Sequence, residues 1–494
     1  MDTNYLLNEL LNYGIDNLGL DNYEVYFRIN ELRRLFKLNE LKFSRIKNKE
    51  ELPDLLLENI TKRALDLKIE MISEAHFKDQ LMGIVTPSHE AVVQKFFTYS
   101  DPKEATNYLY NLGVKNYYIQ KTAIDRNIFF GNDKVEFIIN LSRPEKDNKQ
   151  TAKLLETKKI DFPACMLCLE NLGYEGRDNY PARYSIRIIP LTLGNERWFM
   201  QFSPYSYFPE HAILINEKHQ NMVVNEQTFS KMLDFVKVLP HYFVGSNASL
   251  PIIGGSILNH EHYQAGSYHT PLRKSTEKRL LLKTNEVFLY EIDWFLRSIR
   301  LKSENPEKLR AIVTKVNDFW ENYSDETAGI KAKTGTTQHS ALTPFCYKEG
   351  NYYVFDLIFR NNYTNKKYPD GVFHVAPEYQ NIKKEAIGLL EASGYFVLPG
   401  RLKAEIERIA KVLVANEAKI SADESPLNKH YRLIQDVIDK FGIPENLDEA
   451  EENIKNTILD TCAKILASAS CFKATIAGDK AFEKLIKTLE GVLL

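Results

Sequence analysis

Two histidines separated by a single residue, His260 and His262, stand out in this 494-residue chain as groups that could do chemistry. On an extended backbone, side chains two residues apart point to the same side, with Cα atoms roughly 6.6 Å apart, so both imidazoles can share one site. An imidazole, with an ordinary pKa of about 6.5, is neutral at pH 7 and also leaves readily after it has attacked. The pair could therefore carry a transferred nucleotidyl group, although a His-x-His pair can also be purely structural.

The residues just before these histidines suit an anion. The stretch Pro251–Ser256 is apolar and ends in Gly254, Gly255 and Ser256, where backbone N–H groups can approach phosphate oxygens without obstruction by side chains. Arg183 and Arg187 could pair with substrate phosphates through two hydrogen bonds each. A surface ion pair is the commoner role of an arginine, and that alternative stays open.

A second set of residues has the types that bind zinc. Cys165 and Cys168 form a Cys-x-x-Cys pair, and His219 and His260 follow it along the chain. Two thiolates and two imidazoles suit tetrahedral zinc. The gaps between them exceed those of compact zinc fingers, so an accidental grouping stays open from spacing alone.

Composition limits the classes of protein and partner. Hydrophobic residues make up 44% and charged residues 26%, as in folded globular proteins. The 64 basic and 66 acidic residues leave a net charge of −2, which gives no field to gather nucleic acid or an anionic membrane. Neither a membrane-spanning apolar run nor a basic leader is apparent, so we expect a cytoplasmic protein with no nucleic-acid or membrane partner.

The hydrophobic pattern predicts an α+β protein in three parts: a helical region over residues 1–115, a mixed half over 116–300, and a second mixed half with C-terminal helices over 301–494. Strands are predicted at Val135–Leu141, Arg197–Phe202, Ala212–Asn216 and Tyr352–Phe359. Helices are predicted at Gln227–Val236, in a charged connector at Glu277–Lys308, and after Gly400, where Leu402, Ile406, Ile409 and Leu413 recur at helical spacing.

Several of these segments together resemble a known family. They are Ile139–Asp147, Cys165–Arg177, Gln201–Tyr205, Pro240–Ala248 and Gly254–Gln264. The chain resembles galactose-1-phosphate uridylyltransferases of the second, bacterial type, also called UTP-hexose-1-phosphate uridylyltransferases, over most of residues 60–420. The family belongs to the histidine-triad superfamily. The resemblance implies a duplicated histidine-triad-like mixed sheet, with helical regions at both ends of the chain.

The resemblance also implies roles for single residues. The first type of the family reads His-Pro-His-Gly-Gln where this chain reads His260-Glu261-His262-Tyr263-Gln264. His262 then matches the nucleophile, Gln264 contacts the transferred phosphoryl group, and Asn247 and Ser256 lie along the UDP phosphates. Further residues match the ligands of a structural zinc in the same order: Cys165, Cys168, His219 and His260. Glu261 and Tyr263 depart from the motif, and no counterpart of the first type's iron-binding histidines is found.

The activity implied is a ping-pong transfer of UMP from UDP-glucose to galactose 1-phosphate, giving UDP-galactose and glucose 1-phosphate. Its expected partners are UDP-sugars and hexose 1-phosphates, with no cofactor in the chemistry and a homodimer as the suggested assembly. One alternative is a histidine-triad hydrolase or phosphorylase, in which water or phosphate resolves the uridylylated histidine. Another is a zinc-stabilised binding module for RNA or protein, which the near-zero net charge disfavours for RNA.

Overall fold

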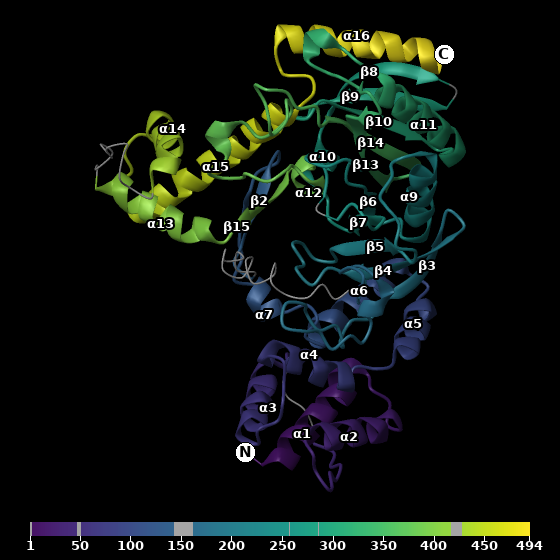
Figure 1. The fold of residues 1–494 in the computed structure, drawn as a ribbon, viewed down its shortest axis with the longest axis vertical. Coiled ribbons are helices and arrows are strands. Elements are labelled where there is room, and N and C mark those ends of the chain that lie inside the picture. Colours follow the sequence, from purple (N-terminus) through teal and green to yellow (C-terminus); the bar gives the residue numbers. More distant parts are fainter. Residues whose placement is uncertain (1, 47–50, 143–161, 256, 285, 416–426) are drawn as a thin grey trace. The chain divides into compact units, whose positions relative to one another are not determined.

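The computed structural model describes residues 2–46, 51–142, 162–255, 257–284, 286–415 and 427–494 (Figure 1). The chain forms two compact units. Unit 1 comprises residues 1–125 and 146–220, and unit 2 comprises residues 126–145 and 221–494. Both units therefore contain stretches that are far apart in the sequence. The predicted boundaries near residues 115 and 300 stay predictions.

Unit 1 begins with the helices expected at the start of the chain. They are α1 (Thr3–Tyr13), α2 (Glu24–Leu35), α3 (Asp54–Asp66), α4 (Glu74–Val85), α5 (His89–Thr98), α6 (Pro102–Lys115) and α7 (Lys121–Ile124). Polar side chains start several of these helices. Ser73 accepts a hydrogen bond from a backbone N–H at the start of α4, and Asp101 does so at α6, where Pro102 fits the first turn.

The strands of unit 1 form an antiparallel series in the order β3 (Ile189–Leu193), β4 (Glu196–Phe202) and β5 (Ala212–Asn216). Gly194 and Asn195 connect β3 to β4, and both have positive φ angles, of 58° and 62°. A two-residue turn with this geometry matches the twist of a hairpin. The predicted strands at Arg197–Phe202 and Ala212–Asn216 are confirmed.

Unit 2 contains a larger antiparallel series, in the order β7-β6-β13-β14-β10-β9-β8. Its strands are β6 (Phe243–Gly245), β7 (His262–Gly266), β8 (Glu277–Thr284), β9 (Val287–Ile292), β10 (Ser298–Ser303), β13 (Ser340–Glu349) and β14 (Tyr352–Asn361). A smaller sheet has the order β1 (Ile128–Gly131), β2 (Glu136–Asn140) and β15 (Tyr395–Pro399), with β2 and β15 parallel. A short hairpin joins β11 (Lys333–Thr334) and β12 (Thr337–Gln338).

The core of unit 2 lies around β13 and β14, which are buried along most of their length. Helices α9 (Glu226–Val238) and α11 (Pro306–Asn322) pack against each other and against β13 (Figure 1). Trp320 of α11 is fully buried, and its Nε1–H donates to the carbonyl oxygens of Ala341 at 3.0 Å and Arg360 at 3.1 Å. These bonds fix α11 on the two central strands.

The expected helical connector at Glu277–Lys308 is wrong, because most of this stretch forms β8, β9 and β10. In β9, Val287, Leu289 and Glu291 are buried in alternation, which is the period of a strand. Four charged residues of this stretch, Glu277, Lys278, Arg279 and Lys283, lie on β8, the outer strand of this series. Charged residues on an edge strand discourage pairing with another chain.

Helices complete unit 2. They are α10 (Pro271–Lys274), α12 (Leu389–Ala392), α13 (Arg401–Val414), α14 (Tyr431–Phe441), α15 (Leu447–Ala469) and α16 (Ile476–Leu493). The predicted apolar stripe of α13 is confirmed, since Leu402, Ile406, Ile409 and Leu413 are all buried. No helix among the described residues has the length and apolar character needed to cross a bilayer. The α+β class is confirmed, while the duplication of a histidine-triad-like half stays a prediction.

Candidate functional site

His262 begins strand β7 in unit 2, and its side chain is only 8% exposed. Its Nδ1 lies 2.7 Å from the carbonyl oxygen of His260. A carbonyl oxygen can only accept, so Nδ1 carries the proton and the neutral ring keeps its lone pair on Nε2. Burial lowers the pKa of His262, which favours the neutral ring. The arrangement therefore leaves one ring nitrogen able to attack an electrophile.

Asn247 lies at the same end of the β6–β7 pair as His262. Gly245, the last residue of β6, pairs with Gln264 of β7, and Asn247 follows two residues later. Asn247 is buried, and its Oδ1 accepts a hydrogen bond from the backbone N–H of Leu389 at 2.9 Å. This bond anchors the side chain to a segment that is distant in the sequence.

Gly254 and Gly255 lie close to neighbouring atoms of the protein, while the predicted approach of their backbone to a phosphate stays a prediction. A Cβ atom on Gly254 would lie 2.1 Å from the carbonyl oxygen of Ala248, and one on Gly255 would lie 2.7 Å from Nδ2 of Asn247. Neither position can hold a side chain unless its neighbours move. Ala248 and Ile253 also belong to a small apolar cluster with Ala341 of β13, which holds the turn on the sheet.

Gln264 and Ser256 complete the predicted phosphate-binding group. Gln264 is half-buried and lies two residues after His262 in β7, so both side chains belong to one face of the strand. Ser256 lies outside the described residues. The roles of Gln264, Asn247, Gly255 and Ser256 toward a substrate stay predictions.

Three of the predicted metal ligands come together within unit 1. The Sγ atoms of Cys165 and Cys168 are 3.5 Å apart, and Sγ of Cys168 lies 3.0 Å from Nδ1 of His219. These three side chains could serve as ligands of a metal ion, while the part of His260, which belongs to unit 2, stays a prediction. Burial and the neighbouring thiol of Cys165 raise the pKa of Cys168 to about 12.

The cysteine loop is braced by hydrogen bonds of its own. Asn171 Nδ2 donates to the carbonyl oxygens of Cys165 and Cys168, at 2.8 Å each, and the hydroxyl of Tyr180 donates to the first of these at 3.0 Å. The backbone N–H of Leu167 points at Sγ of Cys165, 3.3 Å away. A rigid loop that presents two thiols about 3.5 Å apart fits the bond lengths of tetrahedral zinc, about 2.3 Å to sulfur.

The two predicted phosphate-binding arginines belong to unit 1. Arg187 donates from Nε, Nη1 and Nη2 to backbone carbonyl oxygens, those of Thr86, Pro87, Tyr184 and Ile186. Burial lowers its pKa to about 10. Arg183 donates to the carbonyl oxygen of Ala182 at 3.1 Å. These contacts favour a structural role for Arg187, and contact of either arginine with a substrate stays a prediction.

Sequence reasoning missed a charged group beside the histidines. Lys231 of α9 reaches Glu261 with Nζ 2.9 Å and 3.2 Å from the two carboxylate oxygens, and the hydroxyl of Tyr263 donates to Glu261 at 2.8 Å. All three side chains are buried. The spacing of Lys231 and Glu261, 30 residues apart on different elements, gave no signal of this contact.

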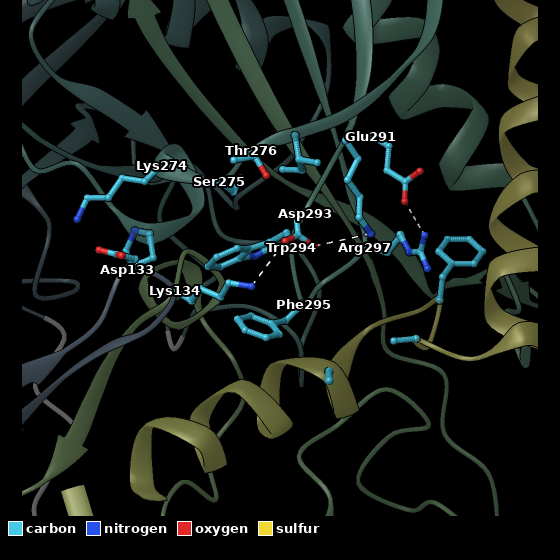
Figure 2. A pocket seen from close by; sticks show the side chains of 16 residues that line it. Asp133, Lys134, Lys274, Ser275, Thr276, Glu291, Asp293, Trp294, Phe295 and Arg297 are labelled. Carbon is cyan, nitrogen blue, oxygen red and sulfur yellow. Dashed lines mark hydrogen bonds and ion pairs between the residues drawn. The ribbon is translucent and has the colours of Figure 1, made fainter. Parts of the chain in front are cut away.

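A further cavity of unit 2, about 310 Å³ in volume, is lined by charged and aromatic side chains (Figure 2). Figure 2 shows Lys134 directed at Asp293, 3.6 Å away, and Arg297 directed at Glu291, 2.6 Å away. The cations drawn there face carboxylates of the protein itself. The cavity does not include His262, and we assign it no ligand.

Comparison with known proteins shows the family to which this chain belongs. Residues 25–221 match the family model described as the N-terminal domain of galactose-1-phosphate uridyl transferase. A galactose-1-phosphate uridylyltransferase of Fusobacterium nucleatum is 38% identical, with 98% of this chain and 99% of that protein covered. The chain belongs to the galactose-1-phosphate uridylyltransferase family.

Other members of the galactose-1-phosphate uridylyltransferase family match over similar lengths. The protein of Clostridium acetobutylicum is 37% identical, covering 98% of this chain and 100% of its own, and that of Bacillus subtilis is 36% identical, covering 98% and 97%. Because the matches run through both units, they include the β6–β7 segment that lies beyond the family model's last residue. Among solved structures, a DUF4931 family protein of Bacillus cereus has a TM-score of 0.25 and 13% identity over 34% of this chain, too slight a likeness to use.

Proposed function

We propose that the protein transfers UMP from UDP-glucose to galactose 1-phosphate through a covalent uridylyl group on His262. The observation that carries the proposal is the His262 ring, whose Nδ1 is held by the His260 carbonyl oxygen at 2.7 Å and whose Nε2 is left with a lone pair. Membership of the family supports the choice of substrates. A ring fixed in one tautomer and orientation loses little entropy when it attacks.

In the first half-reaction, Nε2 of His262 attacks the α-phosphorus of UDP-glucose. A phosphorus–nitrogen bond forms, the bond from phosphorus to the bridging oxygen breaks, and glucose 1-phosphate leaves with that oxygen and its electron pair. The Nδ1 proton stays on the ring, so the uridylylated imidazole carries a positive charge. The His260 carbonyl oxygen, bonded to Nδ1–H, lies where it stabilises that charge.

In the second half-reaction, a phosphate oxygen of galactose 1-phosphate attacks the same phosphorus. The phosphorus–nitrogen bond breaks, its electron pair returns to Nε2, and UDP-galactose leaves. Gln264, the amide of Asn247 and the backbone near Gly255 and Ser256 are proposed to donate hydrogen bonds to the phosphate oxygens in both steps. Donors fixed before the reaction stabilise developing charge without having to reorient.

A labelling experiment tests the proposal. Purified protein is incubated with UDP-glucose labelled at the α-phosphate and is then separated from free nucleotide. We expect acid-labile label on the protein, none on His262→Asn, and normal labelling of His269→Asn, a matched control at an exposed histidine seven residues away. A fully active His262→Asn enzyme would refute the proposal.

A chase of the labelled protein identifies the acceptor. With galactose 1-phosphate, the label should leave as UDP-galactose. If the label leaves as UMP in water alone at the rate seen with the sugar phosphate, the result would support the hydrolase. If it leaves as UDP at that rate when inorganic phosphate is added, the result would support the phosphorylase. The three products are separated by anion-exchange chromatography, so one experiment distinguishes the three reactions.

We further propose that Cys165, Cys168, His219 and His260 bind one structural zinc ion, which takes no part in bond making. The spacing of the two thiols and His219, and the bracing of the cysteine loop, support it. Metal analysis should find about one equivalent of zinc per chain, lost when Cys165 and Cys168 become Ser. Metal-free wild-type protein with full activity would contradict this proposal.

The cellular setting proposed is the cytoplasm, where sugar phosphates and UDP-sugars occur, and the proposed assembly is a homodimer. Sedimentation of the purified protein tests the assembly. A single species at the mass of one chain, 57.2 kDa, across the micromolar range would contradict a homodimer.

A further inference from the structure

Three buried polar side chains meet beside the proposed nucleophile. Lys231 and Glu261 form an ion pair with exposed fractions of only 4% and 1%, and the Tyr263 hydroxyl adds a hydrogen bond to the same carboxylate. We propose that this Lys231–Glu261–Tyr263 network positions His262 for attack. The inference rests on the proposed function of His262, and it assigns the three residues no contact with substrate.

The network lies on the side of β7 opposite to the side chain of His262. Side chains alternate along a strand, so Tyr263 of β7 points to the face opposite to that of His262, and its hydroxyl bonds the Glu261 carboxylate there. The bond of 2.8 Å between Tyr263 and Glu261 agrees with this alternation. The network therefore restrains the backbone around Glu261 and does not occupy the face of β7 that carries the His262 ring.

Helix α9 supplies the fixed end of the network. A reciprocal pair of hydrogen bonds between Asn225 and Thr228 caps its first turn, and Phe229 packs edge-on against Phe355 of β14, with ring centres 5.8 Å apart. The helix also packs against β6 and β13. Lys231 thus projects from an element that is fixed to the central strands, and its ammonium group holds Glu261 at both carboxylate oxygens.

The link from this network to the nucleophile runs through the backbone. The orientation of the His262 ring depends on the carbonyl oxygen of His260, and that carbonyl belongs to the peptide group that joins His260 to Glu261. Rotation of the backbone at Glu261 would turn this oxygen away from Nδ1. Holding the Glu261 side chain from α9 therefore holds the acceptor that fixes the tautomer and direction of the ring.

The sequence departs from the first-type motif at the two positions that join this network. Proline at the position of Glu261 would restrict the backbone through its ring, and glycine at the position of Tyr263 would supply no side chain. Here a buried carboxylate held by Lys231 and Tyr263 takes over the restriction of the backbone. A buried ion pair is by itself poor evidence for stability, because desolvation offsets the attraction, so a specific positioning role better explains its presence.

The test separates positioning from stability. Tyr263→Phe removes one hydroxyl, and the double variant Lys231→Met with Glu261→Leu removes both charges together. We expect each to slow formation of the uridylyl enzyme by about 10- to 100-fold, with KM for UDP-glucose changed by less than about threefold, because a displaced nucleophile loses rate and not binding. Lys231→Met alone leaves a buried carboxylate unpaired and should also unfold at a lower temperature, which the double variant should largely restore.

A matched control is a second buried ion pair of unit 2, between Arg300 of β10 and Asp356 of β14. Asp356→Asn should lower the unfolding temperature while the folded protein still forms the uridylyl enzyme at the wild-type rate. If Tyr263→Phe and the double variant are also labelled at the wild-type rate, the network has no positioning role. If His262→Asn itself becomes labelled, the proposed function fails instead, so the two failures are distinguishable.

Discussion

Asn247 offers a prediction in which stability and activity separate. Its Oδ1 accepts the backbone N–H of Leu389 at 2.9 Å, and its Nδ2 faces the turn at Gly255. In Asn247→Ala the Leu389 N–H, at a fully buried residue, loses its acceptor, which should cost about 1–3 kcal/mol of unfolding free energy. Both activity and stability should therefore fall in this variant.

Asn247→Asp keeps an oxygen for the Leu389 N–H and replaces the proposed phosphate donor by a negative oxygen. Two like charges about 4 Å apart repel by about 4 kcal/mol at an effective dielectric constant of 20, which corresponds to a loss of roughly 1000-fold in kcat/KM. The Leu389 N–H keeps its acceptor, so Asn247→Asp should still fold, although the buried carboxylate lowers its unfolding free energy. The expected signature is a folded enzyme with little activity toward UDP-glucose.

The assays are urea unfolding for stability and coupled kinetics with varied UDP-glucose for kcat/KM. Asn225→Asp is the matched control, because it makes the same chemical change at the start of α9, where Asp is a good helix cap, and should leave both quantities unchanged. Wild-type kcat/KM in Asn247→Asp would refute the placement of Asn247 beside the phosphates. An unchanged midpoint in Asn247→Ala would refute its anchoring role.

The remaining predictions concern backbone packing, a buried cation and acid stability. Gly254→Ala should lower activity by at least about tenfold, measured as kcat, because the added Cβ would lie 2.1 Å from the carbonyl oxygen of Ala248 and must displace the turn. Arg187→Met should lower the midpoint of thermal unfolding and leave KM for UDP-glucose unchanged, because the guanidinium N–H groups of Arg187 donate to carbonyl oxygens of unit 1. A raised KM with normal stability would instead support the predicted contact of Arg187 with a substrate phosphate. Burial opposes ionisation of Glu405, but the hydrogen bond from Lys429 and nearby positive charges outweigh it and hold the pKa of this carboxyl below its usual value. The ionised Glu405 side chain thus stabilises the fold above its unfolded-state pKa, and this contribution is lost as the pH falls through its lowered folded-state pKa. Glu405→Gln should therefore flatten the acid side of a curve of unfolding free energy against pH. An unchanged curve would contradict this prediction.

Elements whose burial follows a regular period could be predicted from the sequence. The apolar run at Tyr352–Phe359 forms part of β14, and the stripe from Leu402 to Leu413 forms the buried face of α13. The stretch after Glu277 was misassigned because an edge strand keeps its charges in solvent, and in a sequence such charges resemble the polar face of a helix. Whether such a stretch forms a helix or a strand depends on hydrogen bonds with an adjacent strand, and the local sequence does not show these.

The same distinction holds for the candidate site. His260 with His262, and Cys165 with Cys168, could be found because each pair is close in the sequence. Lys231 could not, since a lysine on a helix is ordinarily exposed and its carboxylate partner is 30 residues away.

Backbone partners leave even less trace in a sequence. The N–H that holds Asn247 belongs to a residue 142 positions later, and a backbone group has no side-chain signature. The N–H groups of Arg187 suggested a phosphate ligand. They donate instead to backbone carbonyl oxygens, which, like the backbone N–H that holds Asn247, have no signature in the sequence.

The parallel pairing of β2 with β15 has a consequence for synthesis on the ribosome. Residues 136–140 are made more than 250 residues before their partners at 395–399. At about 5–20 residues per second, the nascent chain presents one edge of β2 without its partner strand for roughly 13–50 s. The edge belongs to a buried strand, Glu-Phe-Ile-Ile-Asn, of the kind that pairs readily with other chains. During that interval a chaperone that covers extended apolar segments would protect the growing chain, and unit 2 can complete its fold only after residue 399 has emerged.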